Sequence, residues 1–148
     1  MTASTVPDEV LHRCHYLRTV GALPVYVDSD NRLAVSTGGN LNALTTGEYW
    51  GYRLAERLRE FGIGCPVLWH PLRKLTFLTG ARDGDDTEGL DELLRVTDSR
   101  LVRPGEPVRL PSGVDYTRGW VVPVSGPSRP STDVVLDMLS ACVGAERR

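Results

Sequence analysis

The sequence contains a single lysine, Lys74, so arginine supplies almost all of its positive charge. Seventeen basic residues stand against nineteen acidic ones, and the formal net charge is -2. Without an excess of positive charge, no global field draws the protein onto nucleic acid or onto an anionic membrane. Any contact with a polyanion therefore has to be local.

Cysteine and long apolar runs are also scarce. The three cysteines, Cys14, Cys65 and Cys142, lie far apart in the sequence, so they form neither a CxxC metal clip nor an even disulfide framework, and we expect reduced thiols. No apolar run approaches the roughly 18 to 20 residues that cross a bilayer. The N-terminus has neither the basic head nor the apolar core of a secretion signal. We expect a cytoplasmic protein with no membrane partner.

What remains is the composition of a folded domain, since 41% of the 148 residues are hydrophobic and 24% are charged. Three- and four-residue apolar spacing predicts a helix over residues 5–20 and another that starts near Thr46, where Thr45 and Glu48 form a capping box. The apolar stripe of this second helix is expected to be Trp50, Leu54, Leu58 and Phe61. Further helices are expected at 90–96 and from 131.

Short β-rich runs separate these helices. We predict hairpins of 24–27 with 32–36 and of 67–70 with 75–79, and later strands at 100–102, 107–110 and 119–122. Because hairpins lie between the helices, the expected class is α+β, with an antiparallel or mixed sheet covered by about four helices. We expect one domain over 1–148: an N-terminal helix in 1–22, a sheet core with two helices in 24–124, and a C-terminal helix in 131–143.

Three short motifs contain residues that are typical of metal, anion or catalytic sites, but their spacing matches the known motifs only weakly. Six carboxylates lie in the ten residues 83–92, but they do not match the calcium-binding EF-hand loop, so a solvated acidic loop is expected rather than a metal site. The Thr37-Gly38-Gly39 turn lacks the lysine of a phosphate-binding P-loop, and a simple turn is favoured over an anion cradle. Cys65 is the one cysteine in a predicted loop, and with His70 it is the candidate for nucleophilic catalysis.

Basic and aromatic side chains gather in the second half of the chain. Residues 100–148 carry seven basic and five acidic side chains, whereas residues 1–99 carry ten and fourteen. Arginine and tryptophan on one surface can pair with phosphates and stack on bases. The same residues also fit edge arginines and core tryptophans, and this second interpretation stays open.

Several short strings occur in a recognisable order between residues 33 and 123. They are Leu33–Gly38, Leu41–Leu44, the stretch from Cys65 through His70-Pro71 to Leu78, Thr97–Arg100, and Val108–Gly113 followed by Gly119-Trp120. This order resembles the N-terminal domain of bifunctional DNA primase/polymerases, especially the short stand-alone versions of GC-rich Gram-positive bacteria (actinobacteria).

The resemblance also shows what the chain lacks. In that family, paired acidic residues on one strand hold the divalent metal for nucleotidyl transfer. Here the region that corresponds to the acidic pair has Asn42 and then Thr45 or Thr46. Near the place of a family histidine the chain has Leu75 or Thr76. Only Asp98 matches the remaining acid. The resemblance therefore implies a polymerase-type scaffold with no catalytic residues, no metal and no cofactor.

We accordingly predict a non-catalytic binding or regulatory module that binds a nucleotide, a nucleic acid or a protein partner. One alternative is a small cytoplasmic enzyme that uses Cys65 or His70. Another is a protein-interaction component that forms a homodimer through the helix bearing Met138, Leu139 and Cys142. The candidate ligand-binding residues are Thr37, Asn42, Trp69, His70, Arg73, Lys74, Asp98, Arg109, Arg118 and Trp120.

Overall fold

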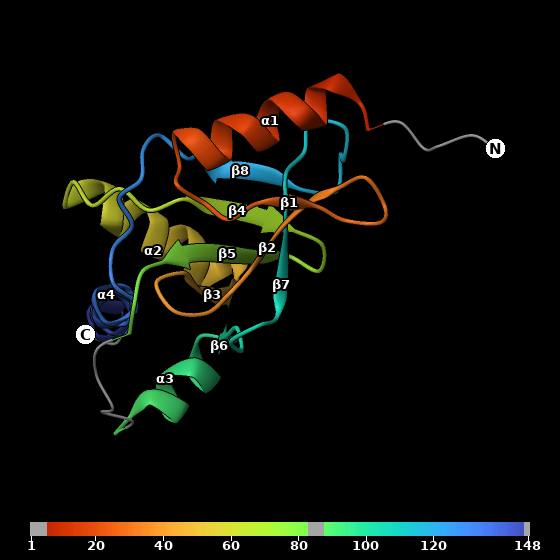
Figure 1. The fold of residues 1–148 in the computed structure, drawn as a ribbon. Coiled ribbons are helices and arrows are strands. Elements are labelled where there is room, and N and C mark those ends of the chain that lie inside the picture. Colours follow the sequence, from red (N-terminus) through yellow and green to blue (C-terminus); the bar gives the residue numbers. More distant parts are fainter. Residues whose placement is uncertain (1–5, 83–87, 147–148) are drawn as a thin grey trace.

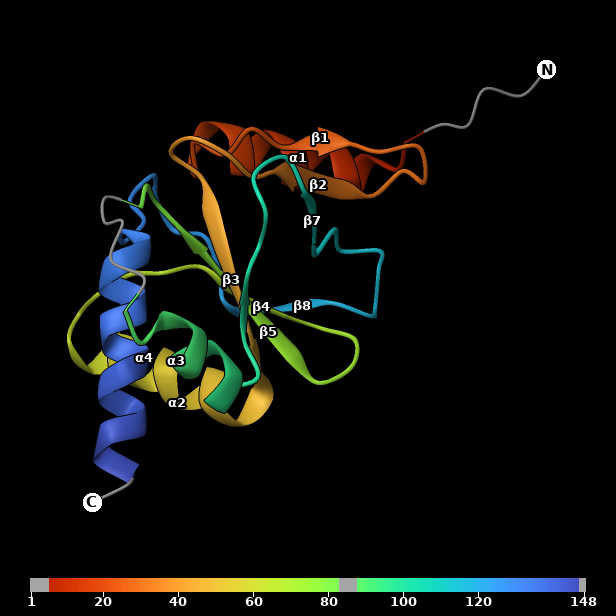
Figure 2. The same ribbon diagram turned by 90° about the horizontal axis from the view of Figure 1, so that it is seen from below.

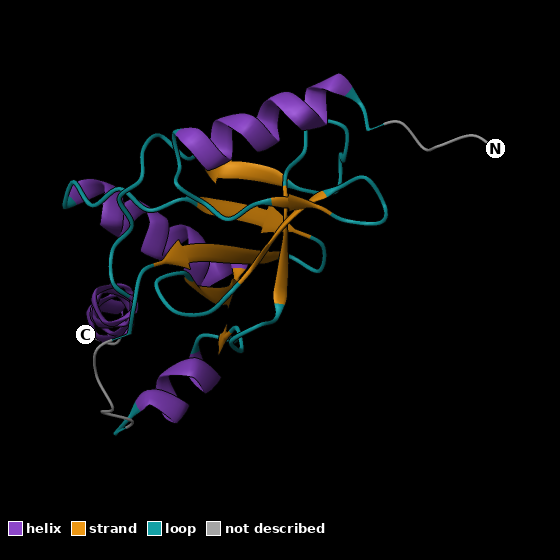
Figure 3. Ribbon diagram, viewed as in Figure 1, coloured by secondary structure: helices purple, strands orange, loops and turns teal. Residues whose placement is uncertain are grey.

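The computed structural model describes residues 6–82 and 88–146, which form four helices and eight strands (Figures 1 and 3). In chain order these are α1 (Asp8–Thr19), β1 (Tyr26–Val27), β2 (Leu33–Ser36), β3 (Asn42–Gly47), α2 (Glu48–Glu60), β4 (Val67–His70), β5 (Lys74–Thr79), α3 (Leu90–Val96), β6 (Arg100–Leu101), β7 (Pro107–Leu110), β8 (Gly119–Val122) and α4 (Thr132–Glu146). In these ranges, no helix has both the length and the apolar character needed to span a membrane.

The strands form two antiparallel sheets, which confirms the predicted α+β class. One sheet has five strands in the order β6-β3-β5-β4-β8, and the other has three in the order β1-β2-β7. Figure 2 shows α2, α3 and α4 on one side of the larger sheet, with α1 and the smaller sheet on the other. The larger sheet is thus the middle layer of the molecule.

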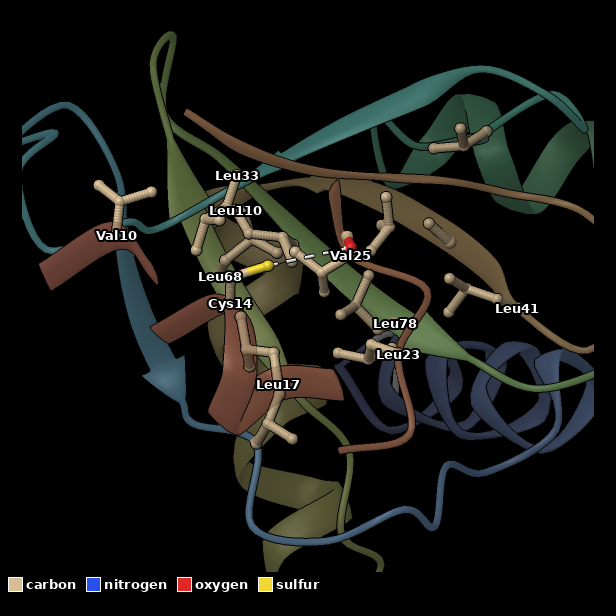
Figure 4. Close-up of a cluster of buried hydrophobic side chains, with 14 residues drawn as sticks. Val10, Cys14, Leu17, Leu23, Val25, Leu33, Leu41, Leu68, Leu78 and Leu110 are labelled. Carbon is tan, nitrogen blue, oxygen red and sulfur yellow. Dashed lines mark hydrogen bonds between the residues drawn. The ribbon is translucent and has the colours of Figure 1, made fainter. Parts of the chain in front are cut away.

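Each face of the five-stranded sheet buries its own apolar cluster because neighbouring side chains on a strand point to opposite faces. On one face, Cys14 of α1 packs with Leu33, Leu68 and Leu110, and its thiol points to the carbonyl oxygen of Val25 (Figure 4). On the other face lies a second cluster, whose members include Leu54, Leu58, Phe77 and Leu139 from α2, β5 and α4. At the end of the first face beside β7, Leu68 and Val102 of the first cluster border a lining that is otherwise largely polar.

The predicted start of the second helix was wrong. Thr45 and Thr46 belong to β3, where they pair with Thr76 and Leu75, and α2 begins only at Glu48 without a side-chain cap. Threonine is β-branched and suits a paired strand, so cross-strand pairing prevailed over the local capping pattern. Phe61 was expected on the buried stripe but lies just past the helix end, where it is 61% exposed.

Candidate functional site

A polar pocket of about 180 Å³ lies where the five-stranded sheet faces β7. Every strand of the larger sheet except β8 contributes to it, and Arg118 reaches it from the residue before β8. The polar and charged side chains of its lining are Thr45, His70, Thr76, Arg100, Glu106, Arg109 and Arg118.

A chain of hydrogen bonds forms the floor of the pocket. Thr45 pairs with Thr76 across β3 and β5, and their hydroxyl oxygens lie 2.8 Å apart. The Thr76 oxygen lies another 2.8 Å from Nε2 of His70 on β4. Both threonines are buried, at 8% and 2% exposure. Because buried polar groups need partners, this floor holds two hydroxyls and one imidazole in a fixed row.

Carboxylates hold two arginines of the pocket wall in place. Arg109 contacts Asp30, with an Nη2–Oδ2 distance of 2.6 Å, and Asp28, with an Nε–Oδ2 distance of 3.3 Å. Arg118 Nη1 lies 3.3 Å from Asp115 Oδ2, and the Asp115 side chain is only 4% exposed. Asp115 also pairs with Arg32, at 3.0 Å. The two guanidinium groups are therefore positioned before any ligand arrives.

Arg118 retains an unused hydrogen-bond donor. Its Nε is buried and has no hydrogen-bond partner within residues 6–82 and 88–146. A buried guanidinium N–H without an acceptor is costly, so it favours an acceptor supplied by a ligand.

The pocket wall also holds a carboxylate that is already neutralised. Glu106 accepts two hydrogen bonds from Arg100, at 3.2 and 2.8 Å, and a third from the backbone N–H of Arg103 at 3.3 Å. The hydrogen bonds from Arg100 hold the pKa of Glu106 below its usual range. Glu106 therefore stays ionised and balances Arg100, as Asp28 with Asp30 balances Arg109 and Asp115 balances Arg118.

His70 experiences a positive environment. Burial of about half of the imidazole lowers its pKa, and the nearby charges of Arg118, Arg100 and Lys74 lower it further. The ring is accordingly neutral at pH 7. The charges that shift it are all positive, and each of these three cations is also paired with a carboxylate, namely Asp115, Glu106 or Asp98.

These groups suit a small oxyanion better than a metal ion or a large ligand. Guanidinium, hydroxyl and imidazole N–H groups all donate hydrogen bonds to phosphate-like oxygens. Drug-sized ligands occupy pockets of about 300–1,000 Å³, so the smaller volume here matches one charged group rather than a whole nucleotide. In the part of the chain that the structure describes, no group of three or more histidine, cysteine, aspartate or glutamate side chains lies where it could hold a metal ion.

Three of the candidate ligand-binding residues, His70, Arg109 and Arg118, come together in this pocket. Trp69 follows the opposite face of β4, where its indole lies against Gly119. Trp120 packs against the first apolar cluster and lines a different groove, between α1 and β8.

The other candidates lie outside the pocket lining. The Thr37 hydroxyl donates to the Arg103 carbonyl at 2.7 Å, and the Asn42 amide donates to the Gly80 carbonyl at 2.9 Å. Lys74 forms an ion pair with the exposed Asp98. Arg73 lies in the β4–β5 turn with a positive φ of 58°. Thr37 and Asn42 therefore join segments of the fold through their hydrogen bonds.

Sequence reasoning missed the roles of Thr45, Thr76, Arg100 and Glu106. The usable signal was a threonine between Leu75 and Phe77, because a polar residue on a strand with both neighbours buried often marks a hydrogen-bonded site. The contact of Thr76 with Thr45 depends on the register of β3 and β5, which the sequence did not reveal.

The structure corrects the expectation that Cys65 is an accessible nucleophile. Cys65 is 3% exposed in the cluster beneath α2, and its sulfur lies 3.4 Å from the Leu78 carbonyl oxygen. Burial raises the pKa of this thiol to about 12. Because the thiolate is the reactive form, Cys65 is inert at neutral pH. His70 lines the pocket on the other face of the sheet, so the two residues form no pair.

Three other expectations concern the C-terminal helix, the acidic run and the glycine turn. Leu139 and Cys142, expected at a dimer surface, are buried in the fold, and Met138 packs against the second cluster. Asp83, Asp85 and Asp86 of the acidic run lie outside the described residues. The Thr37-Gly38-Gly39 segment forms the expected turn, in which Gly38 and Leu41 exchange backbone hydrogen bonds of 2.7 and 3.1 Å.

Comparison of the chain with protein-family models, with curated proteins and with solved structures gives no match.

Proposed function

We propose that the chain is a non-catalytic binding module whose pocket between the sheets holds the phosphate of a nucleotide or of a nucleic-acid end. The observation that carries the proposal is the convergence of three arginines on a hydroxyl and imidazole floor in one phosphate-sized space. Phosphate is a dianion with several acceptor oxygens, and guanidinium groups match its geometry.

The pre-formed wall supports affinity. Arg109 and Arg118 are already held by Asp28, Asp30 and Asp115, so little side-chain freedom is lost when a ligand binds. Arg118 Nε offers a donor that the fold leaves unpaired. The rest of a nucleotide or nucleic-acid strand lies outside the small pocket in this proposal.

The resemblance to primase/polymerase domains is a second support for this proposal. The segments compared with the family's metal-binding strands are β3, β5 and the region before β6, which are neighbours in the larger sheet. On the pocket face these strands carry Thr45, Thr76 and Arg100, whereas Asp98 is exposed and paired with Lys74. Hydroxyl and guanidinium groups do not replace the anionic ligands that a catalytic Mg²⁺ requires.

A polymerisation assay tests the non-catalytic part. The purified chain is incubated with a primed template, nucleoside triphosphates and either Mg²⁺ or Mn²⁺, and no incorporation is expected. Incorporation that disappears in an Asp98→Ala variant would overturn this part of the proposal.

Thermal shift and calorimetry test the binding part, because a ligand of the native state raises its stability by mass action. Inorganic phosphate, a nucleoside monophosphate and a 5′-phosphorylated oligonucleotide are expected to raise the Tm, and the same oligonucleotide with a 5′-hydroxyl is not. An Arg118→Gln variant is expected to bind phosphate about tenfold or more weakly. Arg95→Gln on α3 removes an exposed guanidinium elsewhere and serves as the matched control.

Two results would contradict the binding proposal. One is an equal shift with the unphosphorylated oligonucleotide, and the other is full phosphate affinity in a folded Arg118→Gln variant.

We also propose a cytoplasmic location, supported by three buried cysteines that are all free.

A further inference from the structure

The hydrogen-bond chain on the pocket floor has two possible directions. When Nε2 of His70 carries no proton, it accepts from the Thr76 hydroxyl, and Thr76 in turn accepts from Thr45. In the imidazolium form both ring nitrogens are donors, so Nε2 donates to Thr76 and Thr76 donates to Thr45. The Thr45 hydrogen is then released from the chain. Because Thr45 lines the pocket, that hydrogen becomes available to a ligand.

We propose that the free protein holds neutral His70 with its hydrogen on Nδ1, that Nε2 takes up a proton when a tetrahedral dianion enters the pocket, and that the reversed chain then presents the Thr45 hydroxyl to this anion as a donor. The inference rests on the proposed function and adds the charge class of the ligand and the residues that sense it. His70 and Thr45 then discriminate between a phosphate-like dianion and an uncharged ligand of the same size.

The charges around His70 set the sign of this coupling. The cations that face His70 or line its pocket are Lys74 on β5, Arg100 on β6, Arg109 on β7 and Arg118 before β8. Their carboxylate partners are, in the same order, Asp98, Glu106, Asp28 with Asp30, and Asp115. In the free protein, burial and the nearby cations hold the imidazole neutral at pH 7. A dianion offsets those cations, so the pKa of His70 is higher in the complex than in the free protein.

Because proton uptake by His70 is linked to anion binding, it determines how the affinity for the anion depends on pH. The complex holds more protons than the free protein between the two pKa values of His70, so affinity rises as the pH falls. One linked proton changes the Kd by at most about tenfold per pH unit. A fixed arrangement of arginines alone would bind a dianion with the same affinity throughout this range.

Sulfate is the probe of choice because it stays a dianion, whereas phosphate itself titrates near neutrality. Calorimetry at constant ionic strength measures its Kd from about pH 8 to about pH 6, where we expect a decrease of about tenfold. Repeating the titration near pH 7 in buffers of different ionisation enthalpy gives the number of protons taken up, which is expected to be positive. His70→Gln should bind sulfate with a Kd that no longer changes with pH. His15→Gln, on the exposed side of α1, keeps the full dependence.

The hydroxyl chain has its own test. Thr45→Val keeps the side-chain shape and removes the donor, so sulfate binding at about pH 6 should weaken about tenfold. Thr76→Val interrupts the chain between His70 and Thr45 and should weaken binding at low pH in a similar way. Melting curves identify variants that are folded, and only those are compared.

The outcomes separate the two proposals. A sulfate Kd that is measurable but independent of pH in the unmodified protein would overturn the proton coupling and leave the anion-binding function standing. Unchanged sulfate binding in folded Thr45→Val and Thr76→Val variants would overturn the role of the hydroxyl chain. Failure of both sulfate and phosphate to bind at any pH in this range would overturn the proposed function itself.

Discussion

The hydroxyl oxygens of Thr45 and Thr76 face each other across β3 and β5 at 2.8 Å, beneath a pocket walled by arginines. Leu44 and Leu75, each one residue before them, pack in the apolar cluster on the opposite face of the sheet. One pair of strands therefore supplies both a hydrophobic core and a polar binding floor. This division follows from the alternation of side chains along a strand.

The threonine pair should behave as a coupled unit in stability. Thr76→Val leaves the Thr45 hydroxyl and His70 Nε2 without their shared partner, so we expect a loss of about 1–3 kcal/mol in the free energy of unfolding. Replacing both threonines by valine should cost less than the sum of the single replacements, because no buried hydroxyl is left unpaired. Urea unfolding of the four proteins measures this cycle. Additive losses would show that the two hydroxyls do not depend on each other.

Stability should also fall in mildly acidic solution because of His70. Its pKa in the folded protein lies below the ordinary value of 6.5, so the unfolded chain binds a proton more readily. The contribution of His70 is fully present above pH 6.5 and is lost as the pH falls below that value. His70→Gln should flatten the part of the stability curve just below pH 6.5. Acidic groups with lowered pKa values, such as Asp28 and Asp115, account for losses at lower pH. An unchanged slope in the variant would assign the effect to other groups.

Thiol labelling tests the buried cysteines. The pKa of about 12 for Cys65, together with its burial, predicts reaction with a disulfide reagent at pH 7.5 only through opening of the fold. All three cysteines should react rapidly in denaturant. A Cys65→Ser variant identifies the contribution of that site. Rapid labelling of Cys65 in the folded protein would contradict the burial described above and restore it as a candidate nucleophile.

Two helical glycines form a matched pair for a packing test. A Cβ atom on Gly51 of α2 would collide with the Thr46 hydroxyl and lie 3.1 Å from the Leu75 side chain, whereas one on Gly144 of α4 meets nothing within 4 Å. Gly51→Ala should therefore destabilise the fold by about 1–3 kcal/mol despite the better helix propensity of alanine. Gly144→Ala should stabilise it by up to about 1 kcal/mol. Equal effects in thermal unfolding would contradict the close approach of α2 to the sheet.

Periodicity in the sequence predicted most elements, because apolar spacing directly reflects which face of a helix or strand is buried. The first and last helices and the 67–79 hairpin are examples. The predicted helix start at Thr45 and Thr46 was wrong because two threonines and a glutamate fit both a helix cap and a strand end. Only pairing with β5 distinguishes the two.

The site was harder to foresee than the fold. His70, Arg109 and Arg118 were chosen for their chemical type, and the structure brings them together. Trp69 was chosen beside His70, yet neighbours on a strand point to opposite faces, which separates them. Arg100 became part of the pocket through its pairing with Thr45 on β3, a relation that depends on tertiary register.

The proposed function depends on a phosphate group that binds in the pocket between the sheets. A titration of the isotope-labelled protein with inorganic phosphate, followed by NMR, tests it most directly. We expect saturable shifts of the amide signals of Thr45, His70, Thr76 and Arg118, with little change in α2 and α4. Saturable shifts confined to another face, or no saturable shift at these four residues, would contradict it.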